Sequence, residues 1–373
     1  MPMRKDSVTV SNDIWRLADG GKRKIMFDRT LIEFLIVGVS SLALTAILSH
    51  FIIPILVAKK AGQPIRQEGP RSHYAKAGTP TMGGISFICA MLIIALIMVV
   101  VYAIRGEQNR LIPLGLTLAL AVFNGMIGFF DDYRKLLKKQ NEGLKAWQKF
   151  ALQVIAAVVY IVLLVQFGGL DTTLHIPFID KTVELGVVYY LLAVILIVGV
   201  VNSVNLTDGL DGLASSVTLT VALFFAVVLF TVKTPMLEND GARASLSFVS
   251  SALIGAMIGF LIYNHHPAKV FMGDTGSLFL GGMVVGAAFI IDEPLIIVIA
   301  GGIYIFEAIS VMLQVGIFKV TRIATGTGKR LFKCAPAHHH FEACGWNEIT
   351  VDTVFSLVTV ILCGIAWLGL YFG

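Results

Sequence analysis

Charged residues and cysteines are both scarce in this sequence. Asp, Glu, Lys and Arg make up 14% of the 373 residues, against about 25% in soluble domains, which excludes an ordinary water-soluble globule. Four cysteines are too few for a disulfide framework, and Cys89 and Cys363 lie inside apolar runs. The sequence also lacks a Walker-type loop and a dinucleotide fingerprint, so ATP-driven pumping and redox chemistry have no support.

Apolar residues are abundant instead, at 56% of the chain. Ten apolar runs stand out, and Glu33 and Glu307 are the only charged residues inside them. Nine of the ten meet or approach the ~18–20 residues that cross a hydrocarbon core, which predicts an all-α polytopic integral membrane protein. The runs lie at about 31–57, 85–104, 111–130, 150–167, 187–204, 213–232, 246–263, 277–291, 294–318 and 353–372.

The runs divide the chain into two parts. We expect a polar, basic N-terminal tail over residues 1–30 and a single membrane-embedded domain over residues 31–373. The first run is too long for the core of a cleavable signal peptide, so it should remain as a helix. The pair Gly301-Gly302 predicts a bend in the ninth helix. The short, glycine-rich run at 277–291 is the weakest candidate span, and a re-entrant segment there would reverse the topology of the far half.

Positive residues indicate which loops face the cytoplasm. With ten spans, the segments on one face hold 17 Lys and Arg and the inter-helix segments on the other face hold 5, so the first set is predicted to be cytoplasmic. The basic tail conflicts with this assignment, because ten spans place it outside. On the outer face, residues 171–184 alternate polar and apolar side chains around Pro177 and predict a small hairpin. The cytoplasmic set comprises the segments near 58–84, 131–149, 205–212, 264–276 and 319–352.

Carboxylates gather in these cytoplasmic segments. The third span runs into Asp131 and Asp132, two adjacent acids whose repulsion and desolvation a divalent metal ion would relieve. The alternative is that the basic residues that follow pair with them at a solvated helix end. Lys135 and Lys139 lie along one face of the same helix and are suited to hold phosphate.

A second acidic segment follows the fifth span. Asp208 and Asp211 are three residues apart, so they share a helical face if the sixth helix has already begun. Gly209 and Gly212 admit close backbone approach. The alternative is a tight turn that caps the next helix, although this segment holds two Asp and neither Lys nor Arg.

Two further cytoplasmic motifs are rich in polar residues. Residues 273–277, Gly-Asp-Thr-Gly-Ser, resemble an anion-binding turn in which Asp274 ligates a metal and the nearby Phe271 stacks on a planar base; an N-capped helix start is the alternative. In the last loop, residues 338–340 are three histidines, which suit hydrogen bonding to phosphate or sugar oxygens. A structural zinc site is the rival interpretation there, but the spacings do not match the usual ones for its four candidates, Cys334, His338, His340 and Cys344.

The acidic residues, lysines and histidines on one side of the membrane together predict a site for a divalent cation and a phosphorylated substrate. Mg²⁺ fits best, because one or two carboxylates plus phosphate oxygens commonly hold it. This combination predicts a membrane phosphotransferase. A transporter is the alternative class, although transporters tend to place ionisable residues near the bilayer midplane. Glu307, inside a span, is a further functional candidate, or else it pairs with a buried donor such as Gln314.

Five ordered motifs stand at residues 71–84, 131–132, 205–212, 271–277 and 335–342. Together they resemble the motifs of the bacterial phospho-N-acetylmuramoyl-pentapeptide transferases, within the polyprenyl-phosphate N-acetylhexosamine-1-phosphate transferase superfamily. The resemblance covers about residues 31–372, and the order of five motifs makes it specific. Superfamily members that transfer GlcNAc-1-phosphate share the acidic loops but are not expected to carry both residues 78–84 and residues 335–342 as they stand here. The resemblance therefore favours the muramoyl substrate.

The resemblance implies a catalytic membrane domain that transfers phospho-MurNAc-pentapeptide from UDP-MurNAc-pentapeptide to undecaprenyl phosphate. The products are lipid I and UMP, in peptidoglycan synthesis. It also implies a place in the bacterial cytoplasmic membrane, an active site facing the cytoplasm and Mg²⁺ as cofactor. A homodimer, inhibition by uridine-containing nucleoside antibiotics and the absence of a nucleic-acid partner are expected with it.

The same matching assigns roles to individual residues. Asp274 is expected to bind Mg²⁺ and to act in catalysis with Asp131, Asp132 and His338, while Phe271 is expected to lie beside uracil. Two departures stand out, because the basic tail has no counterpart in the family and residues 322–330 lengthen the last loop. Contacts with the substrates are expected from Lys76, Thr81, Lys135, Lys139, Asn205, Asp208, Asp211, Asn264, Phe271, Gln314, His339 and His340.

Two mechanisms remain open for such a transfer. The second pKa of a phosphate is about 6, so the attacking lipid phosphate is mostly dianionic at neutral pH and barely needs a strong base. Asp131 and Asp132 would then position the lipid phosphate and the metal. The alternative is that an aspartate attacks first and forms an aspartyl intermediate.

Overall fold

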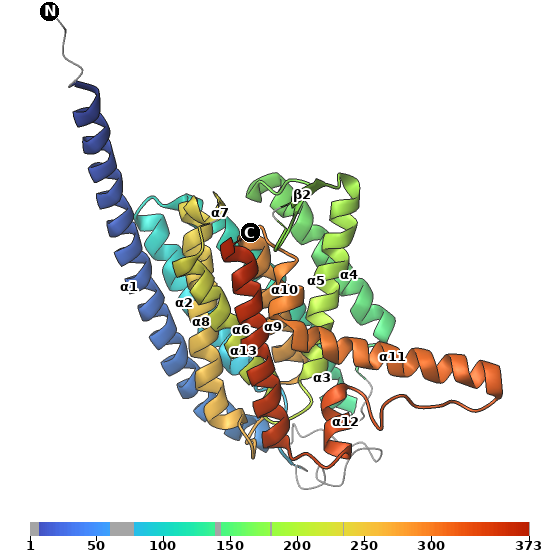
Figure 1. Cartoon of the computed structure of the whole chain (residues 1–373). Coiled ribbons are helices and arrows are strands. Elements are labelled where there is room, and N and C mark those ends of the chain that lie inside the picture. Colours follow the sequence, from blue (N-terminus) through green and yellow to red (C-terminus); the bar gives the residue numbers. More distant parts are fainter. Residues whose placement is uncertain (1–6, 60–77, 139–142, 180, 234, 373) are drawn as a thin grey trace, which may run out of the picture.

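The computed structural model describes residues 7–59, 78–138, 143–179, 181–233 and 235–372, with side chains from Asp28 onward except that of Pro235. Within these residues ten helices are long and apolar enough to cross a membrane, as predicted. Most of them run side by side in one bundle (Figure 1). They are α1 (Ser7–Ala58), α2 (Gly84–Ile104), α3 (Leu111–Lys138), α4 (Ala146–Leu163), α5 (Val187–Thr207), α6 (Leu213–Thr231), α8 (Asp240–Asn264), α9 (Gly273–Ile290), α11 (Gly302–Thr325) and α13 (Glu348–Phe372).

Short elements join the long helices. The hairpin expected over residues 171–184 is present, and Thr173 pairs with Glu184 in its antiparallel register. Figure 1 shows this hairpin at the end of the bundle where α7 also lies, and α12 at the opposite end. The short elements are η2 (Gln108–Arg110), the π-helical η3 (Leu164–Gly168), β1 (Thr173–Ile176), β2 (Lys181–Glu184), α7 (Pro235–Glu238), α10 (Ile296–Ala300) and α12 (Ala337–Ala343).

Helix α1 is longer than a bilayer is thick. It comprises 52 residues, or ~78 Å at 1.5 Å per residue, and so carries the first span and most of the basic segment before it in one helix. Its N-terminal part extends beyond the bundle on the side of α7 and β2 (Figure 1). That is the side on which ten spans place the tail. The boundary between a tail and a membrane domain near residue 30 stays a prediction.

Helix α9, expected to be the weakest span, lies at the centre of the bundle. It is one continuous helix of 18 residues, or ~27 Å, and 94% of its span is buried, against 17% for α1. Its glycines explain how closely its neighbours approach. A Cβ on Gly282 would lie 2.7 Å from the Cα of Ala121 in α3, and one on Gly281 would lie 2.7 Å from the Cα of Val201 in α5. Small residues allow this backbone contact, so the helix that carries Asp274 in its first turn is held by both α3 and α5.

The predicted bend at Gly301-Gly302 is a complete break. α10 ends at Ala300, and α11 starts at Gly302, so the long ninth helix covers 302–325 rather than 294–318. A Cβ on Gly301 would lie 2.7 Å from the carbonyl oxygen of Ile297, which shows how tightly the chain turns there. Figure 1 shows α11 running nearly crosswise to the other long helices and projecting from the bundle. The break brings Glu307 in α11 close to α12.

A strained acidic residue lies at the hairpin end of the bundle and gives a pH-dependent prediction. Asp292 has a φ of 58°, and burial together with the carboxylates of Asp171 and Glu293 raises its pKa to about 6. The neutral carboxyl group of Asp292 therefore contributes to the stability of the fold at low pH, and this contribution is lost as the pH rises through 6. Asp292→Asn keeps a neutral side chain that tolerates this backbone, so it should stabilise the protein by about 1 kcal/mol at pH 8.

Thermal unfolding in detergent at pH 4 and pH 8 measures this effect. The melting temperature of Asp292→Asn should exceed that of the unsubstituted protein at pH 8 and match it at pH 4. An equal gain at both pH values would show that the carboxyl charge is irrelevant there.

Candidate active site

Three carboxylates meet where α3 ends and α9 begins. Asp131 and Asp132 lie near the end of α3, and Asp274 lies in the first turn of α9. Gly128 allows the approach, because a Cβ there would lie 2.7 Å from the nitrogen of Thr275 and would overlap the carbonyl of Asp274. One oxygen from each of the three carboxylates lies within 4.8 Å of the other two. The structure thus brings together residues that are up to 143 positions apart in the sequence, as 131 and 274 are.

Hydrogen bonds hold two of these carboxylates in place. Asp132 Oδ2 accepts the backbone N–H of Thr275 at 2.9 Å and its hydroxyl at 2.8 Å, and Asp131 Oδ1 accepts the N–H of Leu144 at 2.7 Å. Asp132 Oδ1 is buried and has no hydrogen-bond partner among the described residues. Buried oxygens are nearly always paired, so this atom is available to a ligand.

Two lysines neutralise the cluster. Lys135 Nζ lies 2.6 Å from Asp131 Oδ2 and 3.0 Å from Asp274 Oδ2, and Lys149 Nζ lies 2.8 Å from the same oxygen of Asp274. Lys135 was expected here as a phosphate ligand, and its use in that role stays a prediction. Lys149, in the first turns of α4, was not expected, because nothing in the local sequence distinguishes it from a lysine at a solvated helix start.

An amide joins α5 to this cluster. Asn205 Nδ2 donates to Asp274 Oδ1 at 2.7 Å and to the hydroxyl of Ser277 at 2.8 Å. The geometry therefore places Asn205 directly against the predicted metal ligand. The three carboxylates offer oxygen ligands of the kind that Mg²⁺ prefers.

The segment before α2 closes the other side of the cluster. The N–H of Phe271 donates to the carbonyl of Pro80, and the N–H of Gly83 donates to the carbonyl of Phe271, both at 2.8 Å. Thr81 is buried, and its hydroxyl has no partner among the described residues. A Cβ on Gly273, whose φ is +72°, would lie 2.7 Å from Thr81 Oγ1 and 2.6 Å from Asp132 Oδ2. Thr81 therefore faces the carboxylates, whereas Lys76 and Lys139 lie outside the described residues.

Asp208 and Asp211 do not share a helical face. α5 ends at Thr207 and α6 begins only at Leu213, so both acids stand in the turn between the helices. The prediction of a tight turn is therefore confirmed, because the helix that a three-residue spacing needs has not yet started. The capping role predicted for the turn is wrong, since the N-cap of α6 is Gly212 and no side chain among the described residues caps the helix. Burial, followed by the carboxylates of Asp274, Asp132 and Asp211, raises the pKa of Asp208 well above its usual range. Asp208 thus belongs electrostatically to the carboxylate cluster.

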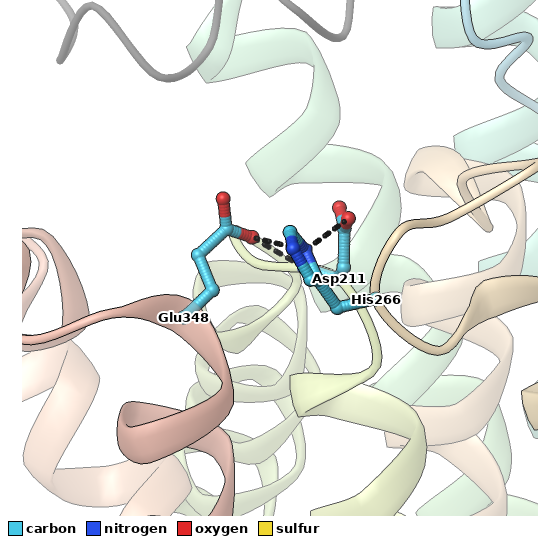
Figure 2. Close-up of side chains that lie close together, drawn as sticks. All are labelled: Asp211, His266 and Glu348. Atoms are coloured by element: carbon cyan, nitrogen blue, oxygen red, sulfur yellow. Dashed lines mark hydrogen bonds and ion pairs between the residues drawn. The ribbon is translucent and has the colours of Figure 1, made fainter.

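Asp211 belongs to a second cluster, shown in Figure 2. His266 Nδ1 lies 3.1 Å from Asp211 Oδ2 and 3.8 Å from Glu348 Oε2, and the N–H of Ala268 donates to Asp211 Oδ2 at 3.0 Å. This group also has metal-ligand spacing. Its members already bind one another, so it acts as a clamp that ties the 208–212 turn to α13 and to the segment after α8. His266 and Glu348 were not singled out from the sequence, because 82 residues separate them.

His338 turns inward at the start of α12. Its Nδ1 lies 3.1 Å from Glu307 Oε1, and its backbone N–H donates to the same oxygen at 3.2 Å. The alternative interpretation, in which Glu307 pairs with Gln314, is therefore wrong. Gln314 instead accepts from the N–H groups of Leu331 and Phe332 and donates to the carbonyl of Phe332, because the loop after α11 folds back along that helix.

The four candidates for a zinc site do not converge. His338 faces Glu307, while His340 accepts the N–H of Lys333 through Nδ1 and lies 3.8 Å from Cys344 Sγ through Nε2. His339 Nδ1 lies 2.7 Å from Glu342 Oε2. The neighbouring histidines thus point to different partners, and the substrate contacts expected of His339 and His340 stay predictions.

Asn264 has its hydrogen bonds inside the protein. Its Nδ2 donates to the carbonyl of Val270 at 2.9 Å, and its Oδ1 accepts the hydroxyl of Ser215 at 2.8 Å. Asn264 is buried, so the structure shows it holding the segment that carries Phe271. Its expected contact with substrate stays a prediction.

Comparisons with known proteins agree with this arrangement. Residues 113–292 match Glycosyl transferase family 4, and residues 76–88 match signature 1 of phospho-N-acetylmuramoyl-pentapeptide-transferase. A phospho-N-acetylmuramoyl-pentapeptide-transferase from Clostridium acetobutylicum is 48% identical over 85% of this chain and 93% of its own length. Proteins of the same name from Clostridium botulinum and Clostridium perfringens are 42% and 43% identical, over 94% and 93% of this chain and 100% and 99% of their own lengths. The chain therefore belongs to the phospho-N-acetylmuramoyl-pentapeptide-transferase family.

Proposed function

We propose that this protein transfers phospho-MurNAc-pentapeptide from UDP-MurNAc-pentapeptide to undecaprenyl phosphate and releases UMP. Lipid I is the other product, and the reaction serves peptidoglycan synthesis. The observation that carries the proposal is the meeting of Asp131, Asp132 and Asp274 with Lys135 and Lys149 at one end of the bundle. Alternating carboxylates and ammonium groups suit a reaction in which a diphosphate is bound and one phosphoryl group is transferred.

The carboxylates fit Mg²⁺, the cofactor we propose. Asp274 would hold the ion together with Asp132, whose Oδ1 is buried, lies 3.6 Å from Lys135 Nζ and has no hydrogen-bond partner among the described residues. Bound Mg²⁺ supplies charge neutralisation for the diphosphate and for the departing UMP. Lys135 Nζ, which lies between Asp131 and Asp274, would bind a phosphoryl oxygen of the diphosphate.

The residues around this cluster orient the reactants. Thr275 holds Asp132, and Asn205 holds Asp274, so both carboxylates meet the substrate in a fixed position. Asp131 would position the lipid phosphate as it attacks. Attack by an aspartate is the alternative, and it leaves a labelled phospho-sugar on the protein when lipid acceptor is withheld. Failure to trap such a label in active protein favours direct attack.

Release of UMP from UDP-MurNAc-pentapeptide in detergent tests the proposal. We expect release that needs both undecaprenyl phosphate and Mg²⁺ and stops when EDTA is added. UDP-GlcNAc, run alongside, should give no UMP; if it alone gives UMP, the substrate is the other hexosamine. Activity in detergent also separates an enzyme from a transporter, because a transporter needs a sealed compartment.

We also propose that the protein lies in the bacterial cytoplasmic membrane with the carboxylate cluster on the cytoplasmic side. The support is the excess of Lys and Arg in the loops at that end. Cys344 is exposed near α12, and Lys181 is exposed on the hairpin at the opposite end. In intact spheroplasts, a membrane-impermeant maleimide should label Lys181→Cys but not Cys344. Permeabilised cells should label both, and labelling of Cys344 alone in intact cells would reverse the orientation.

The homodimer and the inhibition by uridine-containing nucleoside antibiotics stay predictions from the family resemblance.

A further inference from the structure

A buried pair lies apart from the carboxylate cluster. Glu307 is 0% exposed and His338 is 1% exposed. A buried carboxylate is costly unless it is paired, and the backbone N–H of His338 donates to Glu307 Oε1 at 3.2 Å. His338 Nδ1 lies 3.1 Å from the same oxygen, which is within ion-pair distance but without the alignment of a hydrogen bond. One oxygen of Glu307 thus binds the backbone of the first histidine in α12 and contacts its ring.

This contact determines which ring nitrogen is left for another partner. Nδ1 is the nitrogen that lies beside the Glu307 carboxylate, which can only accept hydrogen bonds, and Nε2 is the nitrogen that points away from it. Neither ring nitrogen has a hydrogen-bond partner in the part of the chain that the structure describes, but Nδ1 is in ion-pair contact with Glu307 whereas Nε2 has no such contact there. Since buried nitrogens are nearly always paired, the ring is placed for a partner that the described chain does not supply.

Nε2 is directed at the turn between α5 and α6. A Cβ on Gly209 would lie 2.6 Å from the ring Cε1 of His338 and would overlap Nε2, and the three nearest atoms all belong to His338. The imidazole of His338 therefore fits beside this turn only because residue 209 has no side chain. The preceding residue, Asp208, is within electrostatic reach of Asp274 and Asp132. The ring thus lies beside the acidic turn, on the side of the carboxylate cluster.

We infer that Glu307 is a positioning residue that holds His338 with Nε2 over the Asp208–Gly209 turn, where Nε2–H donates to a phosphoryl oxygen of the bound diphosphate. With Nδ1 beside Glu307, Nε2 is the ring nitrogen left to face the anionic substrate. This inference rests on the proposed function, because that reaction supplies the diphosphate. Glu307 acts through His338 and does not itself touch the substrate.

Two substitutions separate orientation from mere packing. Glu307→Gln keeps an oxygen that accepts from the backbone N–H of His338 but removes the charge beside Nδ1, and Glu307→Ala removes both. Relative to the unsubstituted protein, we expect kcat for UMP release to fall about 10-fold in Glu307→Gln and about 100-fold in Glu307→Ala, the range found when the outer partner of a functional histidine is removed. The KM for UDP-MurNAc-pentapeptide should change less than about threefold, because the lost interaction serves charge that develops during transfer.

A double substitution and a matched control complete the experiment. In a His338→Ala background, Glu307→Gln should lower kcat no further, because the residue it positions is gone. Ser310→Ala, one turn further along α11, removes a buried hydroxyl that bonds to the backbone of Glu307 and should leave kcat within about twofold. A Glu307→Gln variant as active as Ser310→Ala, or losses that add in the double variant, would overturn the inference. No UMP release from the unsubstituted protein would overturn the proposed function instead.

Discussion

Asp274→Asn is expected to lower the rate of UMP release about 1000-fold, which corresponds to about 4 kcal/mol of transition-state stabilisation. Asp274 is where the cluster converges: its Oδ2 lies 3.0 Å from Lys135 Nζ and 2.8 Å from Lys149 Nζ, and its Oδ1 accepts from Asn205. Asparagine keeps the shape of the side chain but removes its charge. Two ammonium groups then lose a partner, and the proposed Mg²⁺ site loses its principal ligand.

The measurement is kcat for UMP release at rising Mg²⁺ concentration, with thermal unfolding followed in parallel. The Mg²⁺ concentration that gives half-maximal rate should rise in the variant as kcat falls. Asp171→Asn, on the hairpin side of the bundle, makes the same chemical change far from the cluster and should retain full activity. If Asp274→Asn keeps more than about a tenth of the rate, another residue holds the metal.

The parts of the fold that follow from local sequence could be predicted. A helix that crosses lipid must satisfy its own backbone, so each span shows itself as an uninterrupted apolar run. The break at Gly301 and the hairpin after Asp171 are equally local, because a glycine pair or a polar–apolar alternation is enough to indicate them. The convergence of Asp131, Asp132 and Asp274 was expected on the weaker ground that their loops share one side of the membrane.

The contacts that complete the site depend on the packing of distant helices. Lys149 approaches Asp274 across 125 residues, and Glu348 approaches Asp211 across 137 residues, so no spacing rule applies to either pair. Glu307 was noticed because a charge inside a span is costly, yet that cost does not specify its partner. The partner is His338 rather than Gln314, since the chain breaks at Gly301 and α12 folds beneath α11.

Gly128→Ala is expected to have the second large effect, through the backbone that places Asp274. A Cβ on Gly128 would overlap the carbonyl of Asp274 and lie 2.7 Å from the nitrogen of Thr275. These are backbone atoms in the first turn of α9, and they cannot rotate away as a flexible side chain would. We expect α3 and α9 to separate slightly, at a cost of about 1–3 kcal/mol in the free energy of unfolding. Displacing the carboxylates by about 1 Å should lower UMP release about 100-fold.

Gly115→Ala supplies the matched control on the same helix. No atom lies within 4 Å of a Cβ at Gly115, so this substitution adds only the helix preference of alanine, about 0.8–1 kcal/mol in favour of folding. The two variants share that preference and differ only in the contact with α9. Melting temperature and UMP release should therefore fall in Gly128→Ala and stay level or rise in Gly115→Ala. Equal behaviour of the two would mean that the distance between α3 and α9 does not control the geometry of Asp131, Asp132 and Asp274.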